Sequence, residues 1–245
     1  MEMQFIYADN AATTKMSDVA VKAMLPYLQE TYANASSVHI LGQRSAAALF
    51  SARQQLAQLL HCAPKELFFT SGGSEADNQA LLSAAAIGRQ QGKRHIISTA
   101  MEHHAILHTL EALDEQGFTV TLLRPQKDGI VTAAQVAAAL TDETCLVSVM
   151  YANNETGAIQ PIKEIGALCR QRGVLFHTDA VQAAGHVDID VQRDNIDMLS
   201  LSAHKFHGPK GVGLLFAKSS IQLTSLIRGG GQERGKRAGT ENLPG

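Results

Sequence analysis

The stretch DMLSLSAHKFHGPKGVGLLFA, residues 197–217, decides the fold. DMLSLS and GVGLLFA are short apolar runs of the kind that form strands buried on both faces of a sheet. The residues between them, 203–210, are too few for a helical crossover, so the second strand must run antiparallel to the first. Polar side chains stand where the first of these strands ends.

Outward from this stretch, apolar runs alternate with amphipathic segments over most of the chain. The other predicted strands are residues 66–70, 95–99, 119–123, 145–151 and 174–179. The predicted helices are residues 45–60, 74–90, 103–116, 132–140 and 161–172. This alternation predicts an α/β protein with a mainly parallel seven-stranded sheet, one antiparallel strand and helices on both faces.

Composition excludes several classes of protein. The 245 residues, 45% of them hydrophobic, suffice for one large core, and the net charge of −2 gives no electrostatic case for nucleic acid. No 18-residue apolar run predicts a membrane span, and the acidic N-terminus is unlike a signal peptide. The three cysteines are far apart, so we expect a reducing, cytoplasmic location rather than disulfides or a zinc site.

Glycines and serines follow the strand at 66–70. Ser71, Gly72, Gly73 and Ser74 form a turn that opens onto a helix, where free backbone N–H groups and the helix dipole suit a phosphate. The same residues could serve only as a helix N-cap.

Two strand ends carry histidine and asparagine. His103 stands where an imidazole could stack on a planar ring or simply face solvent. His104 and His108 have a metal-ligand spacing, yet no third ligand is evident and we expect no metal site. Asn153 and Asn154 are amide donors, although Asn also favours turns.

Asp179 and Lys205 end two neighbouring apolar strands. A carboxylate at such a position is costly unless it is paired, and a protonated pyridine nitrogen is a suitable partner. Gln182, one turn further on, could bond the phenolate oxygen of the same ring. A lysine in a low-dielectric cleft has a lowered pKa and becomes an amine nucleophile. With the turn at Ser74, these residues predict a pyridoxal 5'-phosphate site whose covalent attachment point is Lys205.

Six segments in order strengthen this prediction. SGGSEADN, MEHHAIL, NNETG, HTDAVQ, SAHKFHGPKG and RGGGQERGKRAGTEN resemble the NifS/IscS-type cysteine desulfurases, which are fold-type I pyridoxal-phosphate enzymes of the class V aminotransferase group. YADNAATT near the N-terminus and NASSVHILG at 34–42 are also similar to that family.

The resemblance implies a role for each matching residue. Lys205 would carry the cofactor and move the α-proton of the substrate, and His103 would stack on the ring and assist proton transfer. The implied cofactor-binding residues are Gly73, Ser74, His103, Asn154, Asp179, Gln182, Ser202, His204, Lys205 and, reaching the phosphate of the other subunit of a homodimer, Thr240. The implied substrate-binding residues are Asn34 and Asn154.

The family reaction converts L-cysteine to L-alanine and passes the sulfur to an enzyme cysteine as a persulfide. The persulfide then supplies proteins of iron–sulfur cluster assembly or tRNA thiolation. In the family the sulfur-accepting cysteine lies downstream of the RAGTEN segment. Cys62, Cys145 and Cys169 are predicted to be structural, because they lie after a helix, in a buried strand and within a helix.

The resemblance also predicts a domain organisation. Residues 1–12 form an N-terminal arm that would join a small domain, residues 13–245 form the cofactor-binding large domain, and a C-terminal small domain is expected to be missing. Three alternatives stay open: a selenocysteine lyase, a class V aminotransferase, and a fragment that binds the cofactor without catalysis.

Overall fold

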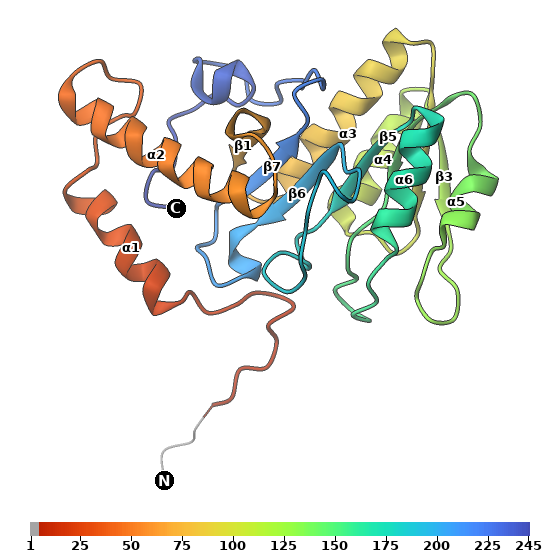
Figure 1. Ribbon diagram of the computed structural model, residues 1–245, viewed down its shortest axis with the longest axis horizontal. Coiled ribbons are helices and arrows are strands. Elements are labelled where there is room, and N and C mark those ends of the chain that lie inside the picture. The colour runs from red at the N-terminus through yellow and green to blue at the C-terminus, as the bar shows by residue number, and fades with distance from the viewer. Residues whose placement is uncertain (1–4) are drawn as a thin grey trace.

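One seven-stranded sheet organises the protein, whose computed structural model describes residues 5–245 (Figure 1). The strand order is β1-β7-β6-β5-β4-β2-β3, and β7 alone runs antiparallel to its neighbours. The strands are β1 Leu67–Thr70, β2 His95–Thr99, β3 Thr119–Leu123, β4 Thr144–Ser148, β5 Leu175–Asp179, β6 Met198–Ser202 and β7 Gly213–Ala217. The predicted α/β architecture and the single antiparallel strand are therefore confirmed.

Helices cover both faces of this sheet (Figure 1). On one face α3 and α4 pack against β-strand residues such as Ile96, Leu146 and Met198. On the other face α5, α6 and the end of α2 pack against Ile97, Phe176 and their neighbours. The bounds of the helices are α1 Asp18–Gln29, α2 Ile40–Leu59, α3 Gly73–Gln90, α4 His104–Glu115, α5 Ala133–Ala139 and α6 Ile162–Arg172. Helices therefore cover the two faces as the strand–helix alternation predicts.

Helix α1 is the element that the sequence pattern did not predict. Ser17 caps it by accepting the backbone N–H of Ala20, and Pro26 lies inside it. None of its residues is buried, although its apolar residues recur at helical spacing, for example at Ala20, Met24 and Tyr27. Helix α2 also begins earlier than predicted, at Ile40, because His39 accepts the N–H of Gly42 and caps it there.

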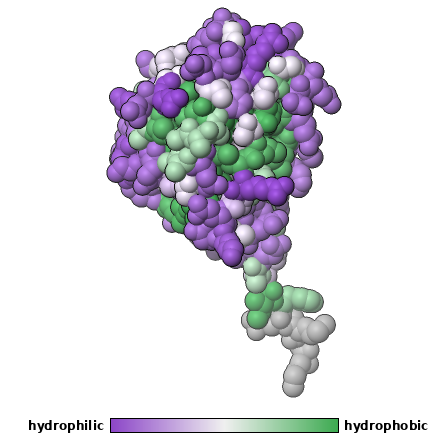
Figure 2. All heavy atoms as spheres, turned by 90° about the vertical axis from the view of Figure 1, so that its right-hand side faces the viewer, coloured by the Kyte–Doolittle hydropathy of each residue, from purple (hydrophilic) through white to green (hydrophobic). Residues whose placement is uncertain are grey.

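Strand β3 forms one edge of the sheet, and Figure 2 shows the corresponding face of the molecule. Apolar residues gather in the middle of this face and hydrophilic residues surround them. Leu122 of β3 is among the exposed apolar side chains of the protein. Within residues 5–245 no helix is both long and apolar enough to cross a bilayer.

Candidate active site

A cavity of about 740 Å³ opens where the parallel strands end. Its volume lies within the range of small-molecule sites, and its position beyond the carboxyl ends of the strands is the usual one in open α/β sheets. Nine of the residues predicted for the site line it: Gly73, Ser74, His103, Asn154, Asp179, Gln182, Ser202, His204 and Lys205. The structure therefore gathers most of the predicted site into one space.

The turn before α3 forms one end of the cavity. Gly72 is the N-cap of this 18-residue helix and supplies no side-chain cap, so the first backbone N–H groups face the cavity unpaired by a side chain. A Cβ atom on Gly73 would lie 2.6 Å from Val181 and 3.5 Å from Ser202. Glycine is thus needed for the helix start to pack this close to the strand ends.

Lys205 lies in a short 3-10 helix, Ala203–Lys205, directly after β6. Its Nζ donates hydrogen bonds to the carbonyl oxygens of Ala11 and of Ala12, the second at 2.9 Å. Partial burial lowers the pKa of the Lys205 amine, while the nearby carboxylates of Asp179 and Asp9 oppose that shift. The predicted lowering of the lysine pKa is therefore present.

The N-terminal segment reaches this site as well. The amide of Gln182 donates to the Ala11 carbonyl at 2.8 Å, and the backbone N–H of Thr14 donates to the carbonyl of His204 at 2.9 Å. The end of the predicted arm therefore contacts the lysine directly, while residues 1–4 of that arm lie outside the described part of the chain.

Asp179 is the buried acid of the cavity, with 6% of its surface exposed. Its Oδ1 accepts the backbone N–H of Val181 at 2.9 Å. Burial raises the pKa of the carboxyl, and the N–H of Val181 and the charge of Lys205 work against that rise. These two contacts stabilise a carboxylate that is available to pair with a cationic ligand group.

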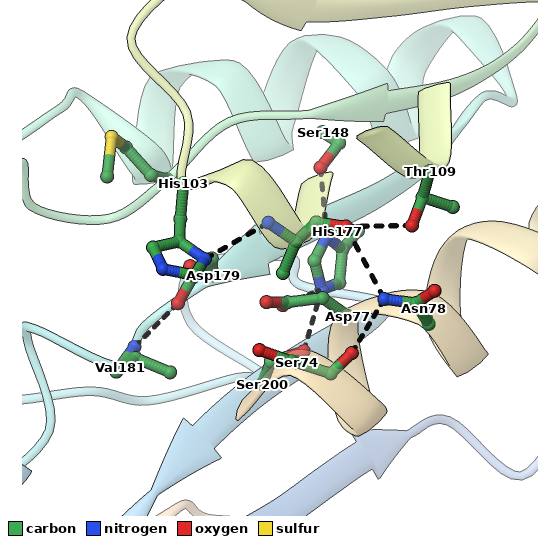
Figure 3. Close-up of polar contacts among 12 residues, drawn as sticks. Ser74, Asp77, Asn78, His103, Thr109, Ser148, His177, Asp179, Val181 and Ser200 are labelled. Carbon is green, nitrogen blue, oxygen red and sulfur yellow. Dashed lines mark hydrogen bonds and ion pairs between the residues drawn. The ribbon is translucent and has the colours of Figure 1, made fainter. Parts of the chain in front are cut away.

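His103 is the N-cap residue of α4 and lines the same cavity as Asp179. Its Nδ1 accepts the N–H of Ala105 at 3.1 Å (Figure 3). Burial, then the charges of His104 and Lys205, lower the pKa of His103. The capping bond requires an unprotonated Nδ1, so a neutral imidazole faces the cavity.

Three buried ionisable residues near Asp179 were not predicted from the sequence: Asp77, Glu102 and His177 (Figure 3 shows the first and last). Asp77 lies in the first turns of α3 and lines the cavity, and His177 lies two residues before Asp179 on β5. The period of two along a strand places His177 and Asp179 on the same face, which is a signal that the sequence does carry.

Two predicted residues lie outside this cavity. The side chain of Asn34 is exposed and accepts the N–H of Ser36 at 2.8 Å. Thr240 lines a second cavity, of about 630 Å³, beside α1 and α2. The rings of His104 and His108 lie 5.1 Å apart, and residues 5–245 contain no group of three or more His, Cys, Asp or Glu that could hold a metal ion.

The three cysteines lie away from the residues that line the larger cavity. Cys145 and Cys169 are buried in β4 and α6, and Cys62 is half-buried after α2. Burial raises the pKa of the thiols to about 11 for Cys145 and about 12 for Cys62 and Cys169. Their position in structural elements is as predicted, and so high a pKa leaves almost no thiolate at neutral pH.

The charged and polar groups that line the cavity suit pyridoxal 5'-phosphate. Uncapped N–H groups at the start of α3 suit the phosphate, and the carboxylate of Asp179 suits a protonated ring nitrogen. Lys205 supplies an amine of lowered pKa. The donor set is thus the one that such a cofactor requires.

Comparison with known families places the chain. The model of the family "Aminotransferase class-V" matches residues 6–244, and the chain therefore belongs to this family. Among curated relatives, "Cysteine desulfurase IscS" of Clostridium botulinum is 52% identical over 240 residues, which are 98% of this chain and 60% of that protein. The protein of the same name from Methanosarcina thermophila is 49% identical over 244 residues, 100% of this chain and 60% of that protein.

Solved structures agree with this assignment. A "NifS-like protein" superposes with a TM-score of 0.95 at 38% identity, covering 99% of this chain and 67% of its own. The structure titled "SspA in complex with cysteine" gives 0.94 at 40% identity, covering 98% and 70%. The predicted resemblance to NifS/IscS-type proteins is confirmed, and the chain spans about 60% of the length of the curated relatives.

Proposed function

We propose that this chain is the cofactor-binding part of a pyridoxal-phosphate-dependent cysteine desulfurase, which converts L-cysteine to L-alanine. The observation that carries the proposal is the convergence of Lys205, Asp179 and the start of α3 on one cavity. Relatives that share about half of the residues of this chain bear the name cysteine desulfurase, which supports the same substrate.

The residues of the chain would hold the cofactor at three points. The N–H groups at the start of α3, with Ser74, Ser202 and His204, would bind its phosphate. Asp179 would pair with the ring nitrogen and Gln182 would contact the phenolic oxygen. Pyridoxal 5'-phosphate, when bound, stabilises the negative charge that develops at the α-carbon of an amino acid.

Lys205 and His103 would handle protons. The lowered pKa of Lys205 increases the fraction of free amine, which can attach the cofactor and later accept the α-proton of cysteine. His103 is neutral and lines the same cavity, so its ring can cover the cofactor face and accept or return a proton. Asn154 lies at the cavity wall, where it would contact both cofactor and substrate.

The sulfur atom would pass to a cysteine thiolate as a persulfide. Cys62, Cys145 and Cys169 have raised thiol pKa values and lie away from the cavity lining, so we assign the acceptor to a cysteine outside residues 1–245. The exposed positions of Thr240 and Asn34 suit contacts made beyond this chain. In a homodimer Thr240 would bind the phosphate of the other subunit, and Asn34 would lie near the substrate carboxylate.

Cofactor binding and turnover are tested separately. Protein mixed with pyridoxal 5'-phosphate should acquire a visible absorption band, and reduction with borohydride followed by peptide mass spectrometry should locate the cofactor on Lys205. Lys205→Ala should lose the band, and Lys163→Ala, on the exposed surface of α6, should keep it. Absence of the band from the unaltered protein would refute the proposal.

Product analysis identifies the reaction when the assay also contains a polypeptide that supplies the sulfur-accepting cysteine. Formation of alanine and persulfide from L-cysteine supports the proposal. Turnover of selenocysteine alone indicates a selenocysteine lyase, and amino-group exchange between alanine and a keto acid indicates an aminotransferase. Proteins of iron–sulfur cluster assembly or tRNA thiolation are the expected sulfur acceptors.

A further inference from the structure

Three buried carboxyl groups interact electrostatically at the cavity, which two of them line. Asp77 of α3 is 1% exposed, Glu102 between β2 and α4 is 5% exposed, and Asp179 at the end of β5 is 6% exposed. Each would repel the others if ionised, and the charge of Asp179 raises the pKa of both of the other groups. Burial and mutual repulsion therefore disfavour the simultaneous ionisation of all three carboxyl groups.

Among the described residues, His177 is the only side chain able to carry a positive charge that lies within 4.0 Å of the Asp77 carboxyl. Its Nε2 lies 3.7 Å from Asp77 Oδ1, which is too far for a hydrogen bond, and that oxygen has no other hydrogen-bond partner. The two ring nitrogens of His177 bond instead to serine hydroxyls, Nδ1 to Ser148 at 2.9 Å and Nε2 to Ser200 at 3.0 Å (Figure 3).

These contacts make His177 a neutral imidazole. A hydroxyl can donate to one ring nitrogen and accept from the other, so one serine on each side satisfies the neutral ring completely. Burial of His177 lowers its pKa to about 3. No imidazolium is therefore available to stabilise a carboxylate at Asp77.

Asp77 and Asp179 differ in what surrounds them. Asp179 accepts the N–H of Val181 and faces the ammonium group of Lys205, and both contacts favour its ionised form. Asp77 has the Ser200 hydroxyl beside it but neither a backbone N–H nor a cation, and burial followed by the charge of Asp179 raises its pKa well above the ordinary value. Burial also raises the pKa of Glu102, to about 8, although its Oε1 accepts the N–H of Met150 at 2.9 Å and the hydroxyl of Thr99 at 2.7 Å.

We propose that Asp77 is a positioning residue that remains a neutral carboxylic acid and so leaves the negative charge of the cavity floor on Asp179. The Ser200 hydroxyl of β6 is the hydrogen-bonding group beside Asp77, and the Ser148 hydroxyl of β4 bonds to His177 instead. Glu75, on the same helix, is paired with Arg237 at 3.0 Å. The charge on Asp179 is then free to bind a cationic ring nitrogen, and this last step rests on the proposed function.

Infrared spectroscopy of the cofactor-free protein tests the charge state directly. A protonated carboxyl has a C=O stretching band that is separate from the bands of carboxylates. At neutral pH we expect this band in the unaltered protein, a partial loss in Asp77→Asn, and a separate partial loss in the matched variant Glu102→Gln. An Asp77→Asn spectrum with undiminished intensity would show that Asp77 is ionised and would overturn the proposal.

A second measurement tests the same charge state without the Asp77→Asn variant, which could fail to fold. In the unaltered chain with ¹³C-labelled aspartate carboxyls, one aspartate should keep the chemical shift of a protonated acid between about pH 5 and pH 8. In Asp179→Asn that residue should ionise at a pH lower by about one unit or more, because the neighbouring charge is gone. Ionisation of every aspartate below about pH 5 contradicts the proposal.

Cofactor affinity then tests the role of the neutral acid. Asp77→Asn should keep the affinity for pyridoxal 5'-phosphate within about threefold, with an unchanged pH midpoint, because no charge is removed. A shift of that midpoint by about one unit, equivalent to a tenfold change in proton affinity, would contradict it. If the unaltered protein binds no cofactor, the proposed function fails, while the infrared and carbon measurements still decide the state of Asp77.

Discussion

The two faces of the sheet differ in the polarity of the side chains that they bury. Facing α5 and α6, the strands bury apolar side chains along their length, including Val147, Phe176 and Leu199. On the face toward α3, the same strands carry apolar side chains near their start. Nearer their end they carry polar side chains, including Ser148 and His177. Alternation along each strand thus separates a face that stabilises the protein from a face that holds the site.

Neighbouring residues on β5 show this separation best. Phe176 and His177 are both fully buried, yet Phe176 packs in the apolar core and His177 bonds to two serine hydroxyls. Burial of the histidine is tolerated because its polar atoms are satisfied without a charge. The difference between the faces is therefore measurable as two kinds of mutational effect.

The largest expected effect is on the apolar face. Phe176→Ala should lower the free energy of unfolding by about 3–5 kcal/mol, because it removes a fully buried ring and leaves a cavity. Chemical denaturation monitored by circular dichroism measures it. Phe50→Ala, at an exposed position of α2, should change stability by less than about 0.5 kcal/mol, and equal losses in both variants would contradict the assignment.

On the polar face the expected loss is in binding. Asp179→Asn keeps the shape of the side chain but removes its charge, so affinity for pyridoxal 5'-phosphate should fall by about a hundredfold. Titration of the visible band measures this loss. Asp188→Asn, whose side chain is mostly exposed, is the control and should leave the affinity unchanged. An Asp179→Asn protein that binds the cofactor normally would show that the carboxylate does not contact the ring.

These two faces also explain what the sequence could predict. The apolar runs located all seven strands, including the partly exposed edge strand β3, and the short connection after Lys205 predicted the antiparallel strand. Helix α1 was missed although its apolar residues recur at helical spacing, because it precedes the strand–helix alternation on which the prediction rested. The predicted residues that line the cavity follow strand ends, whereas Asn34 and Thr240 were predicted only from the resemblance and lie outside it.

Asp77, Glu102 and His177 were not predicted because their significance depends on their neighbours. In the sequence Asp77 is one of several polar residues early in a helix. His177 is a single polar residue within an apolar strand, and nothing around it in the sequence indicates a function. Only the fold brings α3 against the ends of β5 and β6, where these groups meet. The charge state of a buried acid depends on the groups that the fold places around it and not on the neighbouring residues in the sequence.

The ionisation of Glu102 makes the free energy of unfolding depend on pH. Its pKa is raised from 4.5 to about 8, so the folded protein keeps a proton that the unfolded chain releases. Stability from this group is complete below about pH 4.5 and is lost as the pH rises toward about 8. Glu102→Gln removes this loss, so its stability relative to the unaltered protein should improve by about 1–3 kcal/mol between about pH 5 and pH 7.

Denaturation at a series of pH values measures the Glu102 effect. The control is Glu155→Gln, since Glu155 is an exposed residue and should give a pH-independent difference. Glu102→Gln becoming less stable than the unaltered protein as the pH rises would mean that Glu102 is an ionised, paired carboxylate.

The smallest expected effect concerns a single hydroxyl. Ser148→Ala leaves Nδ1 of His177 without its partner at 2.9 Å, and loss of such a buried hydrogen bond should cost about 1–2 kcal/mol of stability. Because His177 is neutral and stays neutral, the cost should be the same between about pH 5 and pH 8. A cost that grows as the pH falls would reveal an imidazolium ion, and the polar face would then rest on an ion pair between His177 and Asp77 rather than on neutral hydrogen bonds.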